Sequence, residues 1–427
     1  MNGIAQRLMD CRAVVICVTL LVFEQGVAAT DTTARGLFAE LKASVYQVRV
    51  IDVASSDKYT IGSGFQIDGV GHIATNFHVV SAYVNDPHKY DLEIQRHDGK
   101  RQSVTVVAVD VVHDLAIIKA EGLASDHLAL QLDELSNGDR IYSMGNPHDL
   151  GMTIIEGNYN GRVKHSRYKK LLFSGSLNGG MSGGPALNSA GEVIGVNVSK
   201  GGEQLSFLVP ARFLNTLIAL LPGEQGGVSF AEQMTADLLA DQAQFYQQVF
   251  SSDAPPHALG DMTFPGKLSE ALECWGHSVD KDDIEYQAVH QHCKSHDRIY
   301  VDEQLQIGEF FYNYEWIDTD TLNRFQFYTF LQERFEHIQL HSSDDEEQVD
   351  EYSCETALVD LTSGSWKVST CQRGYKKHPG LYDALLVMAL VDFPDHSAII
   401  KAGASGISKD NARALYRTMM EDVRWAR

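Results

Sequence analysis

The sequence predicts an all-β first half, built as antiparallel barrels or sandwiches, and an acidic second half of mixed α+β structure. Two observations predict the first half: short β-type runs follow one another from Gly36 to about Leu221, and no long amphipathic helix connects them. The third observation is a change in charge. From Glu224 onward the chain has 35 acidic and 16 basic side chains, or about −19 of the net −22. A chain of 427 residues is too long for one ordinary core, so we expect two domains.

The first 29 residues have the pattern of a secretory signal peptide. Arg7 and Arg12 precede an apolar run, Ala13–Phe23, and Val27-Ala28-Ala29 supplies small residues for cleavage. A run of about 11 residues is short for a bilayer, and an uncleaved anchor or a buried helix is the alternative. We expect an exported protein, periplasmic or extracellular, with no membrane span after signal cleavage.

Residues 30–222 form the predicted β-rich domain, and about 190 residues suffice for two small barrels. Turn signals such as Asp68-Gly69, Asp98-Gly99 and Asn137-Gly138 separate the runs. The predicted strands are Val45–Val53, Gly64–Ile67, His72–Thr75, Leu92–Gln95, Val104–Val109, Leu115–Lys119, Arg140–Met144, Leu171–Ser174, Glu192–Asn197 and Ser206–Val209.

A linker and a helix occupy residues 223–256. After a Pro/Gly-containing joint, Val228–Phe250 has apolar residues on roughly one helical face: Phe230, Met234, Leu238, Leu239 and Phe245. Residues 257–427 then form the acidic α+β domain. Its predicted elements are strands at Gln306–Trp316 and Ser365–Thr370, an ambiguous segment at Thr321–Leu340 and a closing helix at Asn411–Trp425.

All four cysteines that follow the signal peptide lie in the acidic half, and an even number in an exported chain indicates disulfides. Pairing neighbours closes the shortest loops, so we favour Cys274–Cys293 and Cys354–Cys371. The alternative is a zinc site in which His277, His292 and His296 join the first two cysteines.

The strongly acidic charge disfavours two classes of partner, nucleic acid and anionic lipid. One basic run, Lys164–Lys170, stands out in the first half. We interpret it as an exposed hairpin, or otherwise as a site that docks the acidic half or an acidic substrate.

Three segments carry residue types suited to nucleophilic catalysis. Ser182 lies in Gly179-Gly180-Met181-Ser182-Gly183-Gly184-Pro185, where glycines allow a tight turn with exposed N–H groups. His78 follows an apolar strand and can act as a general base. Asp114 heads another apolar strand, and a buried carboxylate there can orient the imidazole.

The segment from Gly62 to Val209 resembles the chymotrypsin-like (trypsin-fold) serine proteases, most of all their bacterial HtrA/Deg branch. The matching blocks are Ile61-Gly62-Ser63-Gly64-Phe65-Gln66-Ile67, Gly71-His72-Ile73-Ala74-Thr75-Asn76-Phe77-His78-Val79-Val80, Asp114-Leu115-Ala116-Ile117-Ile118-Lys119, Met144-Gly145-Asn146-Pro147 and Gly191-Glu192-Val193-Ile194-Gly195-Val196-Asn197, together with the serine loop. The resemblance covers roughly the first half of the chain. It implies two six-stranded β-barrels with the active site between them.

The same resemblance assigns roles to the three residues. His78 becomes the general base, Asp114 its orienting partner and Ser182 the nucleophile, with the backbone N–H groups of Gly180 and Ser182 as the oxyanion hole. The family's specificity pocket falls near Ser176, with walls from Val198 and Ser199 onward; lacking a carboxylate, it suits small or apolar side chains.

Two features depart from the family. Met181 stands where digestive relatives have an aspartate and the bacterial branch usually has an asparagine. Because methionine cannot pair with a newly cut N-terminus, activation by N-terminal clipping is not expected. No carboxylate-binding loop of a PDZ domain is recognisable after Leu221.

The sequence therefore predicts an exported serine endopeptidase that hydrolyses proteins or peptides through an acyl-enzyme, without a metal or an organic cofactor. The alternative is a catalytically silent trypsin-fold protein that binds other proteins.

Overall fold

The structure is a computed structural model that describes residues 33–123, 126–202, 204–221, 229–279, 285–336 and 339–426; the side chains of residues 199–202 are not described. The predicted signal peptide and most of the Pro/Gly-containing joint lie outside these ranges. The described residues all belong to one compact unit. None of the helices in these ranges is long and apolar enough to cross a membrane.

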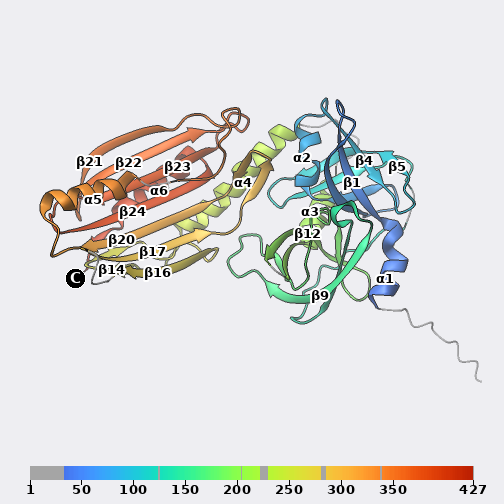
Figure 1. Cartoon of the computed structure of the whole chain (residues 1–427), viewed down its shortest axis with the longest axis horizontal. Coiled ribbons are helices and arrows are strands. Elements are labelled where there is room, and N and C mark those ends of the chain that lie inside the picture. Colours follow the sequence, from blue (N-terminus) through green and yellow to red (C-terminus); the bar gives the residue numbers. More distant parts are fainter. Residues whose placement is uncertain are drawn as a thin grey trace, which may run out of the picture. The chain divides into compact units, whose positions relative to one another are not determined.

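The first β-layer is a seven-stranded antiparallel sheet in the order β5-β4-β1-β2-β3-β7-β6. Figure 1 labels its strands β1, β4 and β5. The predicted closed barrel of six strands is therefore wrong here: an additional strand, β5, forms after the Asp98-Gly99 turn, and the end strands β5 and β6 are not paired with each other. Val104, which is buried, separates β5 from β6 in sequence. The strands are β1 Val45–Asp52, β2 Lys58–Gln66, β3 His72–Thr75, β4 Tyr90–Gln95, β5 Arg101–Ser103, β6 Thr105–Asp110 and β7 Leu115–Lys119.

The second β-layer is a closed barrel of six strands in the order β10-β13-β12-β11-β8-β9, as predicted. Its strands are β8 Arg140–Gly145, β9 Thr153–Arg162, β10 Leu171–Phe173, β11 Pro185–Leu187, β12 Val193–Gly202 and β13 Leu205–Pro210. Short helical segments accompany the two layers: α1 Ala34–Leu41, η1 Lys42–Ser44, α2 Phe77–Asn85, η2 Pro147–Asp149 and α3 Ala211–Ala219.

The second half of the chain is built on a seven-stranded antiparallel sheet in the order β16-β17-β20-β24-β23-β22-β21. Its strands are β16 Leu272–Val279, β17 Gln287–Ser295, β20 Phe310–Asp318, β21 Ser353–Leu361, β22 Gly364–Gly374, β23 Tyr382–Leu390 and β24 His396–Ile407. Smaller pairings involve β14 His257–Leu259, β15 Met262–Phe264, β18 Ile299–Asp302, β19 Leu305–Ile307 and β25 Arg424–Trp425.

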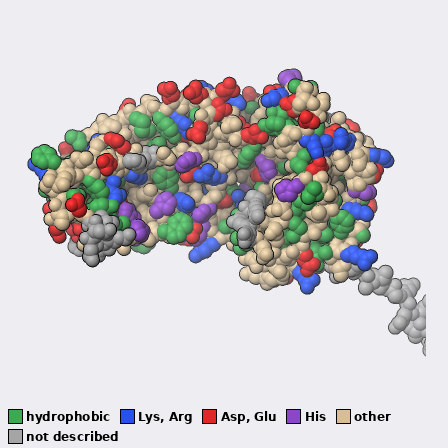
Figure 2. Space-filling model, in the orientation of Figure 1, with side chains coloured by type: hydrophobic (Ala, Val, Ile, Leu, Met, Phe, Trp, Pro, Cys, Tyr) green, Lys and Arg blue, Asp and Glu red, His purple; other side chains and the backbone are tan. Residues whose placement is uncertain are grey.

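Helices cover both faces of this sheet (Figure 1). Helices α4 (Phe230–Phe250) and α6 (Lys409–Glu421) share one core with alternate sheet residues such as Met388 and Ile400. Helix α5 (Arg324–Glu336) packs on the other face against Val387 and Ile399, as the two-residue period of a strand requires. Figure 2 shows acidic side chains gathered along the edge of this sheet where β21 and β22 lie.

Helix α4 connects the core of the first sheet with that of the C-terminal sheet. Met234 and Leu238, in its first half, are buried with residues of β1 and α2, whereas Phe245 and Val249 are buried against the C-terminal sheet. The helix predicted at Val228–Phe250 is thus present with nearly the same bounds. Its two ends face two different cores. The apolar residues predicted on one face of the helix do not indicate that division.

The basic run Lys164–Lys170 docks on the acidic half, which was the second of its two interpretations. Arg167 forms an ion pair of 2.5 Å with Asp241 of α4, and both side chains are largely buried. Asp297 accepts hydrogen bonds from Ser166 Oγ and from the backbone N–H of Arg167, at 3.2 and 2.5 Å. Charge complementarity therefore supplements the apolar contacts between the two halves.

A hairpin of β18 and β19 extends from the second half onto the first sheet. Four of its side chains, Ile299, Val301, Leu305 and Ile307, are at most 4% exposed and lie in the same cluster as Phe77 and Val79 of α2. A hairpin that buries four apolar side chains in another layer's core is held firmly in place.

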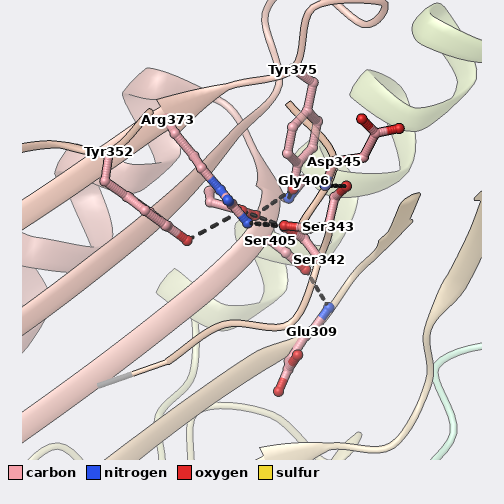
Figure 3. Close-up of polar contacts among 10 residues, drawn as sticks. Glu309, Ser342, Ser343, Asp345, Tyr352, Arg373, Tyr375, Ser405 and Gly406 are labelled. Atoms are coloured by element: carbon pink, nitrogen blue, oxygen red, sulfur yellow. Dashed lines mark hydrogen bonds and ion pairs between the residues drawn. The ribbon is translucent and has the colours of Figure 1, made fainter. Parts of the chain in front are cut away.

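A buried polar network holds the base of this hairpin, and Figure 3 shows the side chains of Arg373, Tyr375 and Ser342 converging there. All three side chains contact the fully buried carboxylate of Asp383; Arg373 Nε lies 2.7 Å from Oδ2 and Tyr375 OH lies 2.5 Å from Oδ1. The carbonyl of Ser342 in turn accepts a hydrogen bond of 2.9 Å from the N–H of Gln306 in β19. Fully satisfied networks of this kind favour one geometry over alternatives.

Two disulfides link neighbouring strands, Cys274–Cys293 between β16 and β17 and Cys354–Cys371 between β21 and β22. These are the pairs that the short loops favour. The alternative, a zinc site, needs free thiolates, whereas Cys274 and Cys293 are bonded to each other in a disulfide. Cys293 is fully buried in the sheet core, whereas Cys354 is exposed.

Replacing each disulfide by two serines separates the contribution of the cross-link from that of burial. The loops span 19 and 17 residues, so loss of either cross-link should lower the free energy of unfolding by about 3 kcal/mol on the chain-entropy model. The Cys274→Ser/Cys293→Ser variant should lose more, because a buried hydroxyl replaces sulfur. Urea unfolding measures both variants; equal losses would contradict the burial argument.

Candidate active site

His78 and Asp114 form a hydrogen-bonded pair beside the start of helix α2. One carboxylate oxygen of Asp114 accepts the backbone N–H of His78 at 2.8 Å, and the other lies 2.7 Å from His78 Nδ1. Asp114 lies in the turn between β6 and β7 with φ of 58°, and its carbonyl accepts a hydrogen bond from Asn76 Nδ2 at 2.7 Å. Because an ionised carboxylate only accepts, Nδ1 carries the proton and Nε2 is left with its lone pair.

The pKa of His78 lies above its ordinary value of 6.5. Burial favours the neutral imidazole and lowers the pKa, but the negative charge of Asp114 and its hydrogen bond outweigh burial. The imidazole side chain is 27% exposed and the carboxylate 17%. The pair can therefore stabilise an imidazolium while one edge of the ring stays open.

The serine loop packs directly against the residues that lead into α2. Gly183 has φ of 84°, and a Cβ added to it would lie 2.9 Å from the backbone nitrogen of Asn76. The carbonyl of Ser182 accepts a hydrogen bond of 2.7 Å from the N–H of Ser63 in β2. These contacts bring the serine loop to the His78–Asp114 pair, although its residues are far from both in sequence.

The hydroxyl of Ser182 donates to the carbonyl of Val198 at 3.2 Å. The structure thus joins His78 to Asp114 directly, whereas Ser182 Oγ has no hydrogen bond to His78 among the interactions of the described residues. Hydrogen bonds of catalytic groups are often loose without substrate and tighten when it binds. A rotation about the Cα–Cβ bond is the movement that would free Oγ from Val198.

The backbone of Gly180 is turned so that its N–H is available. Its φ is 92°, and its carbonyl accepts a hydrogen bond of 2.7 Å from Ser63 Oγ. Ser63 is fully buried and also accepts the N–H of Asn146, at 2.9 Å. Within the described part of the chain, the N–H groups of Gly180 and Ser182 have no hydrogen-bond partner, so both can donate to an oxyanion.

Met181 anchors this loop through its side chain. It is fully buried among barrel residues such as Phe173 and Leu208. Its carbonyl accepts hydrogen bonds from Asn197 Nδ2 and from the N–H of Gly184, at 3.2 and 3.1 Å. The unusual residue before the serine is thus part of the core, where its apolar side chain is favourable.

The residues predicted to form the specificity pocket do not all lie together. Val198 lines a cavity of about 260 Å³ that also includes His78 and Asp114. Ser176 is half-buried in the loop between β10 and β11 and is not among the residues lining that cavity. Ser199 follows Val198 in β12, opposite Phe207, and its side chain is not described.

Asp110, four residues before Asp114, pairs with another histidine. Its carboxylate lies 2.7 Å from Nδ1 of His113, whose ring stacks on Phe213 at 3.7 Å. This separate pair leaves Asp114 as the carboxylate that contacts His78.

Sequence reasoning did not identify the contacts that Ser63 and Tyr300 make beside the candidate site. Ser63 lies within one of the blocks that resemble the family, but its sequence context does not indicate its hydrogen bonds. Tyr300 of β18 approaches His78 edge to face with ring centroids 5.9 Å apart, and its hydroxyl lies 3.4 Å from Ser81 Oγ. No local sequence signal connects a residue of the acidic half with this site.

Replacing Ser63 by alanine tests how the loop is held. Ser63→Ala leaves the carbonyl of Gly180 and the N–H of Asn146 without their partner, so the free energy of unfolding should fall by about 1–3 kcal/mol. The reaction of Ser182 with a fluorophosphonate should also slow. Ser44→Ala is the matched control, because its buried hydroxyl binds the carbonyl of Asp126 outside the site. Equal effects of both variants on the labelling rate would refute the role of Ser63.

The segment that contains this site matches a known domain model. The model of the trypsin-like peptidase domain matches residues 62–196. The chain is 32% identical over 168 residues to a probable periplasmic serine endoprotease, DegP-like, of Chlamydia pneumoniae, which covers 37% of this chain and 33% of that protein. It is 31% identical to serine protease HTRA1 of Xenopus laevis, over 37% of this chain and 35% of that protein. It is 32% identical to serine endoprotease DegS of Salmonella typhimurium, over 35% of this chain and 45% of that protein.

Among solved structures, a serine endoprotease from Yersinia pestis has a TM-score of 0.39 and 25% identity, covering 44% of this chain and 66% of that one. Deg5 has the same TM-score and 26% identity, covering 44% of this chain and 92% of that one. The chain spans less than half the length of the curated relatives named above. The resemblance inferred from the sequence is confirmed by the family model and these relatives: residues 62–196 are a trypsin-like peptidase domain related to the HtrA and Deg serine proteases.

Proposed function

We propose that the protein is an exported serine endopeptidase that hydrolyses peptide bonds of proteins or peptides through a Ser-His-Asp triad. The single observation that carries this proposal is the Asp114 carboxylate, which binds both the backbone N–H and Nδ1 of His78 beside the serine loop. This arrangement leaves Nε2 of His78 free to accept a proton. The backbone N–H groups of Gly180 and Ser182 can donate to the negative charge that develops on the substrate.

The proposed reaction begins when Ser182 Oγ leaves the carbonyl of Val198 and attacks the substrate carbonyl carbon. His78 Nε2 takes the hydroxyl proton, while Asp114 stabilises the resulting imidazolium. The N–H groups of Gly180 and Ser182 donate to the oxyanion of the tetrahedral intermediate. His78 then protonates the leaving amine, and an acyl-enzyme on Ser182 remains until water, activated by the same imidazole, releases it.

The alternative, a silent trypsin-fold protein that binds other proteins, is not favoured. It was motivated partly by Met181, and the burial of that side chain explains the residue without loss of the site. An intact His78–Asp114 pair has no evident use in a pure binding module. The relatives are also named as proteases or endoproteases.

The location and the division of the chain are further parts of the proposal. A relative named as periplasmic and the N-terminal signal pattern both support export. We assign residues 30–222 to the peptidase domain, 223–256 to a linker and helix, and 257–427 to an acidic α+β domain with two disulfides. Since α4 and the β18–β19 hairpin share a core with the first sheet, this domain is expected to fold together with the peptidase.

The Ser182→Ala variant tests the nucleophile. Without Oγ no acyl-enzyme can form, so peptide hydrolysis should fall by about a factor of 10⁶ and fluorophosphonate labelling should vanish. Cleavage of a denatured protein mixture by the mature protein, followed by mass spectrometry, measures the loss. Ser44→Ala is a control for labelling, because its hydroxyl donates to the carbonyl of Asp126 outside the site. Unchanged hydrolysis by Ser182→Ala would refute the assignment.

The pH dependence of labelling tests the base. His78 must be neutral to accept a proton, and its pKa is raised, so the labelling rate should fall as the pH drops through a value above 6.5. Asp114→Asn removes the charge that raises this pKa; the rate should drop by about 10⁴, and the remaining acid limb should move to lower pH.

The matched control is Asp68→Asn, because Asp68 pairs with a different histidine, His72, at 2.5 Å. That variant should leave the acid limb where it is in the unsubstituted protein. An acid limb that stays in place in Asp114→Asn, or moves equally in both variants, would contradict the role of the pair.

A further inference from the structure

The cavity next to His78 is closed on one side by the acidic half of the chain. Its volume is about 260 Å³, and one wall comes from His78, Asp114 and Val198. Another part of the lining comes from Ile299 and Tyr300 of the β18–β19 hairpin, with Arg298 just before them. The remaining lining residues are Val111, Val112, His113, Tyr168, Lys170, Val209, Pro210 and Phe213.

The polar groups around this cavity are already paired. Lys170 forms an ion pair with Asp297 at 3.3 Å, and Arg298 forms one with Glu309 at 3.1 Å. The hydroxyl of Tyr168 donates to Asp241 at 3.2 Å.

Apart from the His78–Asp114 pair, two other polar lining groups have partners as well. His113 pairs with Asp110, and the hydroxyl of Tyr300 shares a hydrogen bond with Ser81. A charged or strongly polar ligand would have to compete with these contacts. The surfaces that remain are valine side chains and aromatic rings, which favour an apolar occupant.

The size and place of the cavity indicate what that occupant is. At about 260 Å³ it lies below the roughly 300–1,000 Å³ of sites for whole small molecules, but it can hold one branched or aromatic side chain. It adjoins both the proposed base, His78, and Val198, whose carbonyl contacts the proposed nucleophile. A substrate bound between Ser182 and His78 would therefore lie beside this cavity.

We propose that this cavity is a substrate subsite completed by the acidic half, in which Tyr300 and Ile299 select an aliphatic or aromatic side chain of the polypeptide being cleaved. This inference rests on the proposed function, because the occupant belongs to a substrate of Ser182. It assigns to the second half of the chain a role in specificity at the reaction centre.

The hairpin is placed firmly enough to act as a wall. Ile299 and Val301 are buried in the core of the first sheet, and α2 carries His78 over the same core. At its base, Gly308 N–H donates to the carbonyl of Ser405 at 3.1 Å, next to the Asp383 network of Figure 3. Tyr300 is half-buried, and burial raises the pKa of its phenol to about 12, so the ring stays neutral.

Substitution at Tyr300 tests the wall. Tyr300→Ala enlarges the cavity, so the preference at one substrate position should shift towards larger aromatic side chains. We expect the relative kcat/KM for these side chains to rise by about tenfold. Tyr300→Phe keeps the ring and loses only the hydroxyl, and its preference should stay within about twofold of the unsubstituted protein. Cleavage profiling of a peptide library measures both variants in the full-length mature protein.

Tyr286→Ala is the matched control. This tyrosine of the acidic half also has a hydrogen-bonded hydroxyl, accepting from Arg334 at 2.9 Å, but it lies outside the cavity. Its side-chain preference should be unchanged. Fluorophosphonate labelling and thermal unfolding, recorded for every variant, report whether Ser182 and the fold remain intact.

The outcomes distinguish this inference from the function on which it rests. Normal labelling of Tyr300→Ala with an unchanged preference at every substrate position would overturn the inference alone. A shift equal to that of Tyr286→Ala would also overturn it. Failure of the unsubstituted protein to be labelled would overturn the proposed function and the inference with it.

Discussion

The apolar contact between helix α2 and the β18–β19 hairpin is the constraint on which the arrangement of the site depends. Phe77 and Val79, on either side of His78, are buried in the same cluster as Ile299 and Val301 of the hairpin. One core therefore fixes the position of the proposed base and of the tyrosine that faces it. Because this core combines residues from both halves of the chain, the second half is part of the site's framework rather than an appendage.

The serine loop is held by a different set of contacts, which are mostly polar. Ser63 fixes the carbonyl of Gly180, and Asn197 holds the carbonyl of Met181, whose side chain is buried in the closed barrel. With these carbonyls held inward, the N–H groups of Gly180 and Ser182 have no protein partner in the described ranges. Preorganised donors of this kind stabilise developing charge without reorganisation during the reaction.

Much of the first half could be predicted from local patterns. Each of the ten predicted runs lies wholly or largely within an observed strand, and the three residues of the proposed triad came from motifs in which each type has a clear chemical role. Strand β9 was missed because Gly157 and its neighbouring asparagines suggest a turn. In the barrel, a Cβ at Gly157 would lie 2.6 Å from the ring of Phe173, so close packing explains the glycine.

The second half was harder to predict because its strands lack a simple alternation. β16 and β17 carry histidine, glutamine and cysteine, and β24 contains several alanines and glycines. The segment Thr321–Leu340, which was ambiguous, contains helix α5. Tyr300 could not be found at all from sequence, because it meets Ser81 across 219 residues. Contacts of that separation depend on the assembled core and not on any local pattern.

The open first sheet, in place of a six-stranded barrel, illustrates the same limit. Residues 101–103 pair only with β4 and residues 105–110 only with β7; the two end strands adjoin at Val104 but form no ladder with each other. A list of strands does not contain that information.

The most direct test of the account is whether Ser182 and His78 act at one carbonyl. A peptidyl chloromethyl ketone is attacked at its carbonyl by a nucleophilic serine, and its methylene then alkylates the adjacent imidazole with loss of chloride. Peptide mapping by mass spectrometry should locate the adduct on His78 in the unsubstituted protein and should find little in Ser182→Ala. An adduct spread over His72, His113 and other histidines, or one that forms equally without Ser182, would contradict a shared reaction centre.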